Sequence, residues 1–279
     1  MIPQVKELVR PLLLDGVRRR LRCVFVLSSG RVGTDTLTRL LDLSPSIRAD
    51  HEPSPLFLKE SCCAYQSGHE GGAEVAKTYL NSRLLRNRHG AFLAYCARRG
   101  LIYAETSNRL TYFADALAEL MPRSVFIHLH RHPGDVVRSG MRRGYYVSNE
   151  WDRWRITPRP TDPFAEEWDR WDSFSRTCWY WRAVNEVALQ TSAALGSQRA
   201  YDLPSSVLFQ ANLPELAKLF NWIGADVPAD DAVQGVLSVR HNEQSSGKFP
   251  AWRDWSGVQK AELRRIAGDV AERLGYDLS

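Results

Sequence analysis

Three short apolar segments, each followed at once by a polar stretch and then by helical spacing, constrain this chain more than any other feature. They lie at 23–28 (CVFVLS), 100–105 (GLIYAE) and 124–129 (SVFIHL). Continuous apolar runs of this length are typical of strands that are buried on both faces of a sheet. Strands that alternate with helices imply a parallel sheet covered by helices. The sequence therefore predicts an α/β fold of three layers, with a central, mostly parallel sheet flanked by helices.

Further elements follow from the same spacing rules. A short second strand should end near residue 51, and another short strand is expected near 198–201. Helices are predicted over 36–43, 110–121, 134–140, 164–195, 214–223 and 258–274. The long helix is expected to start after Asp162-Pro163 and to stop at Gly196. We expect one domain, 1–279, with a loop and helix insertion around 145–195 that carries six tryptophans.

Composition limits the class of protein without identifying it. The 37 Lys and Arg exceed the 32 Asp and Glu, a surplus of +5 that suits an anionic ligand as well as nucleic acid. The five cysteines are odd in number and form no CxxC pair, which argues against a disulfide framework and a zinc site. We see neither a signal peptide nor 18 consecutive apolar residues. We therefore expect a soluble, cytoplasmic protein with no membrane span.

The segment between the first apolar run and its helix, 29–36 (SGRVGTDT), has the form of an anion-binding loop. Small residues between a buried strand and a helix present backbone N–H groups and the positive helix end to an anion. Gly30 and Gly33 permit tight turns, and Arg31 adds a permanent positive charge. Gly33 is followed by Thr-Asp where a nucleotide kinase loop needs Lys-Ser or Lys-Thr. The sequence therefore favours a donor that needs no metal.

Two motifs together resemble one family. SSGRVGTDTLTRLL resembles the 5′-phosphosulfate loop of sulfotransferases that use 3′-phosphoadenosine 5′-phosphosulfate (PAPS), which is commonly GRSGTTLL or PKSGTTW. HLHRHPGDVVRSGMRRG resembles that family's 3′-phosphate segment, with Arg131, Pro133, Asp135 and Ser139 in the expected order. Ser246-Gly247-Lys248 matches the family's C-terminal loop more loosely. The similarity covers most of the chain and implies a sulfotransferase fold of the phosphate-loop NTPase type.

The resemblance implies that PAPS is the donor, that 3′-phosphoadenosine 5′-phosphate (PAP) is the product and that no metal takes part. The implied donor-binding residues are Ser29, Gly30, Arg31, Val32, Gly33, Thr34, Asp35, Thr36, Arg131, Ser139 and Lys248. Asp35 departs from the family pattern, which has Ser or Thr there. A carboxylate pointing at the donor would repel it, so we expect Asp35 to point away and to stabilise the helix N-terminus.

The resemblance also indicates catalytic residues. Arg31 is expected to contact the leaving-group oxygens. A base should lie at the carboxyl edge of the sheet, where Glu52 and His51 follow the second strand; we favour Glu52, and a purely structural role for both stays open. Glu105, in a segment that resembles the family's EKTP, is a reserve candidate. The histidines around Arg131 are expected in the core or supporting the site, because alternation along a strand leaves them no third metal ligand.

The acceptor cannot be named from these residues. A hydroxyl or amine of a small molecule, glycan or lipid fits the chemistry, and the proline-rich loop with Trp151 and Trp154 is a candidate lining of its pocket. A nucleoside or sugar kinase, or a nucleotide-binding protein without chemistry, remains an alternative. Nucleic acid is disfavoured because the arginines are scattered among several elements. A homodimer stays open.

Overall fold

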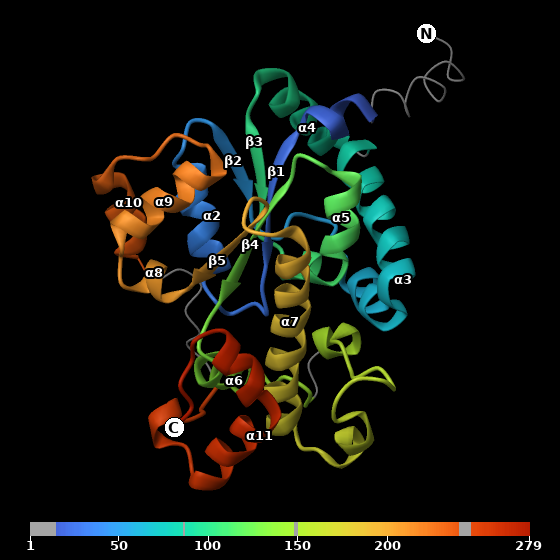
Figure 1. The fold of residues 1–279 in the computed structure, drawn as a ribbon, viewed down its shortest axis with the longest axis vertical. Coiled ribbons are helices and arrows are strands. Elements are labelled where there is room, and N and C mark those ends of the chain that lie inside the picture. The colour runs from blue at the N-terminus through green and yellow to red at the C-terminus, as the bar shows by residue number, and fades with distance from the viewer. Residues whose placement is uncertain (1–14, 86, 148–149, 240–246) are drawn as a thin grey trace.

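A five-stranded parallel sheet forms the centre of the computed structural model, which describes residues 15–85, 87–147, 150–239 and 247–279 (Figure 1). The strands run in the order β2-β3-β1-β4-β5. Every neighbouring pair is parallel. Their bounds are β1 Arg22–Leu27, β2 Ile47–Asp50, β3 Ile102–Glu105, β4 Val125–His130 and β5 Ala200–Pro204. The prediction of an α/β protein built on a parallel sheet is confirmed.

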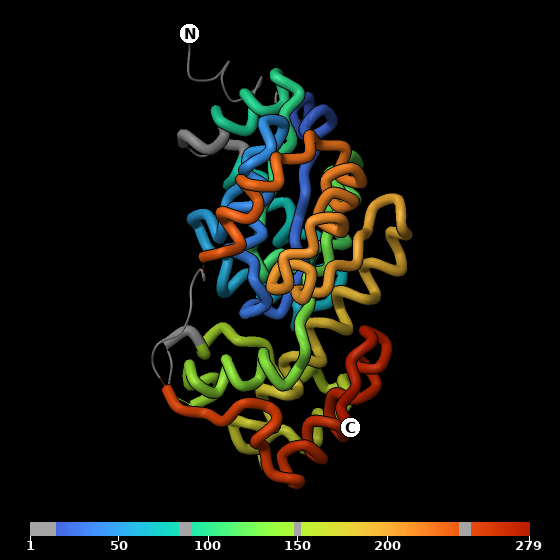
Figure 2. Tube along the Cα trace, turned by 90° about the vertical axis from the view of Figure 1, so that its left-hand side faces the viewer, coloured from blue at the N-terminus to red at the C-terminus, as the bar shows by residue number. Residues whose placement is uncertain are grey.

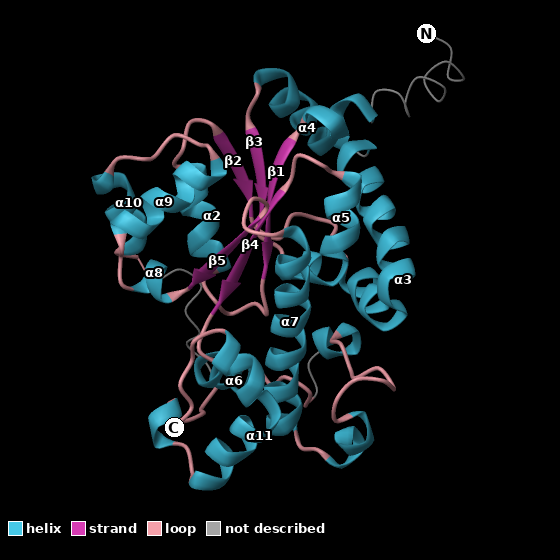
Figure 3. Cartoon of the chain, in the orientation of Figure 1, coloured by secondary structure: helices cyan, strands magenta, loops and turns pink. Residues whose placement is uncertain are grey.

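Helices cover both faces of the sheet, as Figures 1 and 3 show. On one side lie α2 (Thr34–Asp42), α8 (Ser206–Phe209), α9 (Leu213–Ile223) and α10 (Asp230–Leu237); on the other lie α3 (Leu58–Leu85), α5 (Ala114–Leu120) and α7 (Ser173–Leu195). The remaining helices are α4 (Asn87–Arg99), α6 (Pro133–Arg142) and α11 (Gly257–Arg273). The central strand β1 is buried over Cys23–Leu27, which explains its unbroken apolar run.

In Figure 3 the strands all run downward, toward the half of the molecule that holds α6 and α11, with β5 inclined toward α8. Figure 2 shows that the segments 131–147 and 247–279, which are far apart in the sequence, group together beyond this edge. The polar segments after the strands therefore converge where ligands bind in open parallel sheets. This convergence places the candidate site.

The longest predicted helix begins later than expected. Residues 165–170 form a separate 3₁₀ turn, and α7 starts at Ser173 after Asp172, whose side chain accepts a hydrogen bond from the backbone N–H of Ser175. Asp162 does not cap this helix, because its carboxylate pairs with Arg159 at 2.7 Å. The predicted helices do not include α3, α4, α8 and α10. That the chain is one domain stays a prediction.

The second half of β4 carries a buried histidine, His128, whose Nε2 lies 3.0 Å from Oδ1 of Asn185. Burial lowers the pKa of His128 to about 4, and the neighbouring His130 adds to the effect. The unfolded chain binds this proton below about pH 6.5. Because the folded pKa is depressed, stability that is present above pH 6.5 is lost as the pH falls.

We therefore expect the free energy of unfolding to drop by about 2 kcal/mol from this histidine alone between pH 7 and pH 5. Urea titrations of the wild type and His128→Gln at both pH values measure it. The variant should lose less stability on acidification than the wild type does. Equal losses in the two proteins would show that His128 takes no part.

Candidate functional site

The loop that follows β1, residues 29–36, has a backbone shaped to bind an anion, and we call it the anion cradle. Gly30, Arg31 and Gly33 adopt positive φ angles of 72°, 61° and 102°. Gly33 precedes the first residue of α2, and no side chain caps that helix end. A Cβ on Gly33 would lie 3.3 Å from side-chain atoms of Leu208 and Phe209, in a conformation that other residues rarely adopt. The α2 N-terminus therefore keeps backbone N–H groups available for an anion.

Neighbouring elements hold this loop in place. The Ser28 backbone N–H donates to Thr111 Oγ1 at 3.0 Å, and the Tyr180 hydroxyl donates to the Ser29 carbonyl at 3.1 Å. Val32 is fully buried and anchors the centre of the loop. The loop conformation thus depends on two other elements of the fold, the 3₁₀ turn Asn108–Phe113 and α7, and on the burial of Val32.

The remaining predicted loop residues line the first turn of α2. Thr34 and Thr36 are largely buried. The Asp35 carboxylate pairs with Arg39 one turn along α2, at 3.3 Å. Asp35 therefore sits in the first turn, where a negative charge stabilises the helix dipole, and its charge is balanced by an arginine.

The two sequence motifs meet in space. Arg31 Nε, in the loop, donates to Oγ of Ser139, on α6, at 3.0 Å. Ser139 lies two turns into α6, whose first residue is Pro133. Residues 108 positions apart in the chain are therefore in direct contact, and the loop and the arginine-serine segment form one site.

Positive charge is concentrated at this junction. Burial lowers the pKa of Arg31, and repulsion from the nearby Arg143 and Arg131 lowers it further. Tyr145 and Glu52 act in the opposite direction. A bound anion would relieve this repulsion, so the electrostatics of the site suit a ligand with more than one negative group.

Arg131 is held on two sides. Its guanidinium pairs with Asp135 at 3.1 Å and lies 4.8 Å from the ring centroid of Phe209. The same ring approaches Gly33, so Phe209 spans the distance between the two motifs. Phe209 is 54% exposed, which leaves part of its ring available to stack against an aromatic ligand. The sequence pattern does not single out Phe209, although α8, which ends at Phe209, follows β5 and so begins at the carboxyl edge of the sheet, where ligands bind.

The C-terminal loop approaches the same helix. Arg142 Nε, on α6, donates to the Gly247 carbonyl at 3.0 Å, and Arg138 Nε donates to the Phe249 carbonyl at 3.2 Å. Lys248, between these two anchors, is exposed. Ser246, predicted with Lys248, lies outside the described residues. The loop that carries Lys248 is thus fastened to the helix that carries Ser139.

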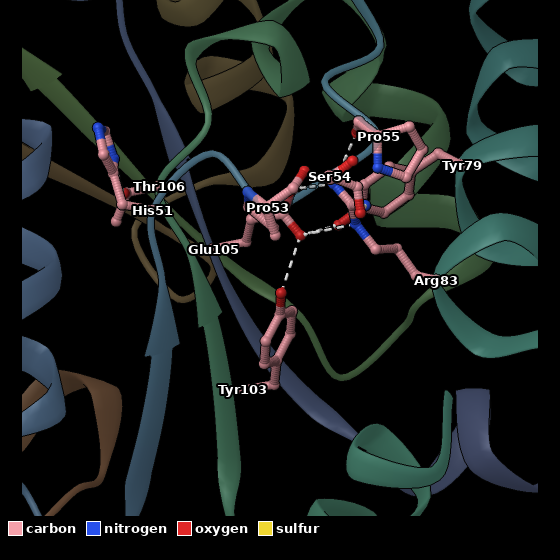
Figure 4. Close-up of polar contacts among 9 residues, drawn as sticks. All are labelled: His51, Pro53, Ser54, Pro55, Tyr79, Arg83, Tyr103, Glu105 and Thr106. Carbon is pink, nitrogen blue, oxygen red and sulfur yellow. Dashed lines mark hydrogen bonds and ion pairs between the residues drawn. The ribbon is translucent and has the colours of Figure 1, made fainter. Parts of the chain in front are cut away.

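The two candidate bases follow β2. His51 is half-buried, and its Nδ1 lies 2.9 Å from Oγ1 of Thr106, the residue after β3 (Figure 4). Glu52 is exposed, has a positive φ of 44°, and acts electrostatically on Arg31. Both residues lie at the carboxyl edge of the sheet, next to the anion cradle.

The reserve candidate Glu105 has a different setting. It is fully buried and accepts hydrogen bonds from Tyr79 at 2.6 Å, from Tyr103 at 3.0 Å and from Arg83 at 3.1 and 3.2 Å (Figure 4). Burial alone would lower the pKa of Arg83, but the attraction of Glu105 raises it. With its oxygens engaged by three donors, Glu105 is suited to holding structure rather than accepting a substrate proton.

Arg83 links Glu105 to the loop 53–55, which follows the candidate bases in the chain. Its two terminal nitrogens donate to the carbonyls of Pro53, Ser54 and Pro55 at 2.8 to 3.2 Å (Figure 4). The Glu105–Arg83 pair therefore fixes the backbone directly after Glu52. Sequence analysis missed Arg83 because helix α3 was not predicted.

The described residues were searched for metal-binding clusters and for helices that could span a membrane. There, no group of three or more His, Cys, Asp or Glu side chains is arranged to hold a metal ion. In the same ranges no helix is both long enough and apolar enough to span a bilayer.

Comparisons with known proteins agree with the overall fold. The sulfotransferase domain of the Synechococcus PCC 7002 olefin synthase is 18% identical, with a TM-score of 0.59 over 94% of this chain and 97% of that one. Sulfotransferase STF9 from Mycobacterium avium is 15% identical, with a TM-score of 0.55 over 98% and 82%. The sulfotransferase domain of the curacin biosynthetic pathway is 15% identical, with a TM-score of 0.54 over 94% and 100%. At these identities the likeness shows the fold.

No curated protein sequence is significantly similar to the chain. A sequence profile described as the sulfotransferase family matches residues 23–229, well over half of the chain. The matched range begins in β1 and includes the anion cradle, the candidate bases and the arginine-serine segment of α6. From the extent of this match, and from the fold that it shares with the three solved domains, the chain belongs to the sulfotransferase family.

Proposed function

We propose that the protein transfers a sulfuryl group from PAPS to a hydroxyl or amine of a small-molecule, glycan or lipid acceptor. The observation that carries the proposal is the hydrogen bond between Arg31 and Ser139, because it joins two separate anion-binding motifs into one site. PAPS has anionic groups at two separate positions of its ribose, a phosphate at the 3′ oxygen and a phosphosulfate at the 5′ oxygen. A donor with one phosphate cluster, such as ATP, would leave one motif unused.

The residues present fit this donor. Backbone N–H groups at the start of α2 and the Arg31 side chain would hold the 5′-phosphosulfate. Arg131 and Ser139 would hold the 3′-phosphate, and the exposed ring of Phe209 would stack on the adenine ring of the donor. When bound, PAPS supplies the sulfuryl group, and the electron pair of the broken S–O bond stays with the 5′-phosphate.

We also propose a cytoplasmic location and an acceptor site beside the tryptophan-bearing loop. All five cysteines are free thiols, which fits a reducing compartment. Within the loop, Arg155 is buried with its guanidinium 3.4 Å from the ring centroid of Tyr145. The Tyr145 phenol acts electrostatically on Arg31, so Tyr145 lies near the anion-binding loop. An apolar acceptor would pack against the Tyr145 ring.

A thermal-shift panel of PAP, PAPS, ATP, GTP and AMP tests the donor. We expect the unfolding temperature to rise more with PAP and PAPS than with equal concentrations of the other nucleotides, since a tighter ligand stabilises the folded state more. A larger rise with ATP and magnesium would contradict the proposal and point to a kinase.

Replacing Arg131 by alanine should weaken PAP far more than adenosine 5′-phosphosulfate, which has no 3′-phosphate. Loss of a charge-assisted hydrogen bond predicts a loss of about tenfold or more in PAP affinity. Calorimetric titration of both nucleotides into wild type and variant measures the difference. Equal losses for the two ligands would mean that Arg131 does not read the 3′-phosphate.

A further inference from the structure

Three short contacts connect His51 to the first turn of α2. Oγ1 of Thr38 lies 2.8 Å from the carbonyl oxygen of Thr34 and 2.5 Å from Oγ1 of Thr106. Oγ1 of Thr106 in turn lies 2.9 Å from Nδ1 of His51 (Figure 4). Both threonines are buried, Thr106 completely, so their hydroxyl groups depend on these contacts for hydrogen bonds.

The number of protons decides which atom donates in each contact. A carbonyl oxygen only accepts, so Thr38 gives its single hydroxyl proton to Thr34. The contact between the two hydroxyls then uses the proton of Thr106. The third contact needs a proton on Nδ1 of His51. If Nδ1 carried no proton, only two hydroxyl protons would be available for three contacts, and one of the three contacts could not be a hydrogen bond.

We propose that the hydroxyls of Thr38 and Thr106 hold neutral His51 in the tautomer protonated at Nδ1, which leaves Nε2 as the proton acceptor of the reaction. Nε2 has no hydrogen-bond partner in the part of the chain that the structure describes, and it is not sealed from solvent. Thr106 is then a positioning residue, because it acts through His51 and touches no reacting atom.

The role in catalysis rests on the proposed function. The acceptor oxygen or nitrogen forms a bond to sulfur, the S–O bond to the 5′-phosphate breaks with its electron pair on that phosphate, and the acceptor proton passes to Nε2. Glu52, favoured by sequence analysis as the base, is exposed and interacts with the charge of Arg31. The hydrogen-bond geometry therefore favours His51 over Glu52.

Proton-detected ¹⁵N NMR of the histidine rings tests the tautomer without any activity. The full chain is labelled with ¹⁵N-histidine, and His51→Gln identifies the His51 signals. We expect neutral His51 to be protonated at Nδ1 in the wild type, and Thr106→Val to shift the population toward the Nε2-protonated form. A wild-type ring protonated at Nε2 would overturn the proposal, whatever the enzyme transfers.

Kinetics then test the link to catalysis, with PAPS as donor and a phenol as the probe acceptor. Thr106→Val should lower kcat about tenfold and leave the KM for PAPS within about twofold. Thr106→Ser, which keeps the hydroxyl, should restore kcat, and the matched control Thr191→Val, at a buried position in α7, should change neither constant. An unchanged kcat in Thr106→Val would contradict the role of this hydroxyl. Absence of PAP release by the wild type with every hydroxyl and amine acceptor tested would contradict the proposed function and leave the NMR result standing.

Discussion

Replacing Arg31 by methionine should lower kcat by about two to three orders of magnitude, because the variant loses the charge that, in the proposed function, faces the leaving group. Methionine keeps much of the side-chain length and removes the guanidinium that donates to Ser139. The measurement is PAP release from PAPS, with a phenol as probe acceptor. The affinity for PAP should fall as well, since the site then loses a half-buried cation.

Arg39→Met is the matched control for this variant. Arg39 is a half-exposed arginine of α2 that pairs with Asp35, one turn from the loop. We expect its removal to change kcat by less than about twofold, because exposed ion pairs contribute little. If both variants lost activity to the same extent, the effect would come from total charge, and the special role of Arg31 would be refuted.

The largest expected effect on stability comes from Glu105→Leu. This change leaves the buried guanidinium of Arg83 without its carboxylate, and it removes the acceptor for the hydroxyls of Tyr79 and Tyr103. Breaking a buried ion pair on one side lowers the free energy of unfolding by about 3 to 5 kcal/mol. For a chain of this size, that corresponds to a fall of about 10 °C in Tm.

Tyr103→Phe distinguishes the contribution of the Glu105–Arg83 ion pair from that of a neighbouring hydrogen bond. It removes one donor to Glu105 and leaves Arg83 in place, so it should cost about 1 kcal/mol. Urea titrations of the three proteins give the comparison. A loss for Glu105→Leu no larger than that for Tyr103→Phe would show that the ion pair does not hold this part of the fold together.

The sequence predicted the sheet well because its signals are local. Buried strands such as β1 and β4 are short unbroken apolar runs, and the loop at 29–36 combines glycines, an arginine and a helix start within eight residues. The motif at Arg131 and Ser139 likewise depends on spacing along a single helix. Such features can be recognised before any contact between distant segments is known.

The missing parts depend on distant contacts. Helix α3 shows little periodicity and is interrupted at Gly68, where φ is 64°, so its pattern does not indicate one long helix. Arg83 acquires its function only when α3 packs beside Glu105, and the sequence holds no sign of that pairing. The start of α7 was predicted too early because Asp162-Pro163 resembles a helix start, while Asp162 bonds instead to Arg159 and Tyr65.

The choice between Glu52 and His51 as the base also depends on contacts between distant segments. From the sequence, Glu52 and His51 differ only in residue type, and both stand at a strand end. The geometry adds the contact between His51 and Thr106, whose partner Thr38 belongs to α2. A hydrogen-bond chain across three elements cannot be inferred from spacing along one of them.

Calorimetric titration of the wild type with PAP, 5′-AMP and 3′-AMP tests most directly whether the loop at 29–36 and the Arg131–Ser139 segment bind one nucleotide together. In the proposed binding mode, each monophosphate occupies one of these two motifs, and PAP occupies both. We expect PAP to bind at least about tenfold more tightly than either monophosphate, from the added charge-assisted hydrogen bonds. PAP affinity no greater than that of the better monophosphate would contradict the account.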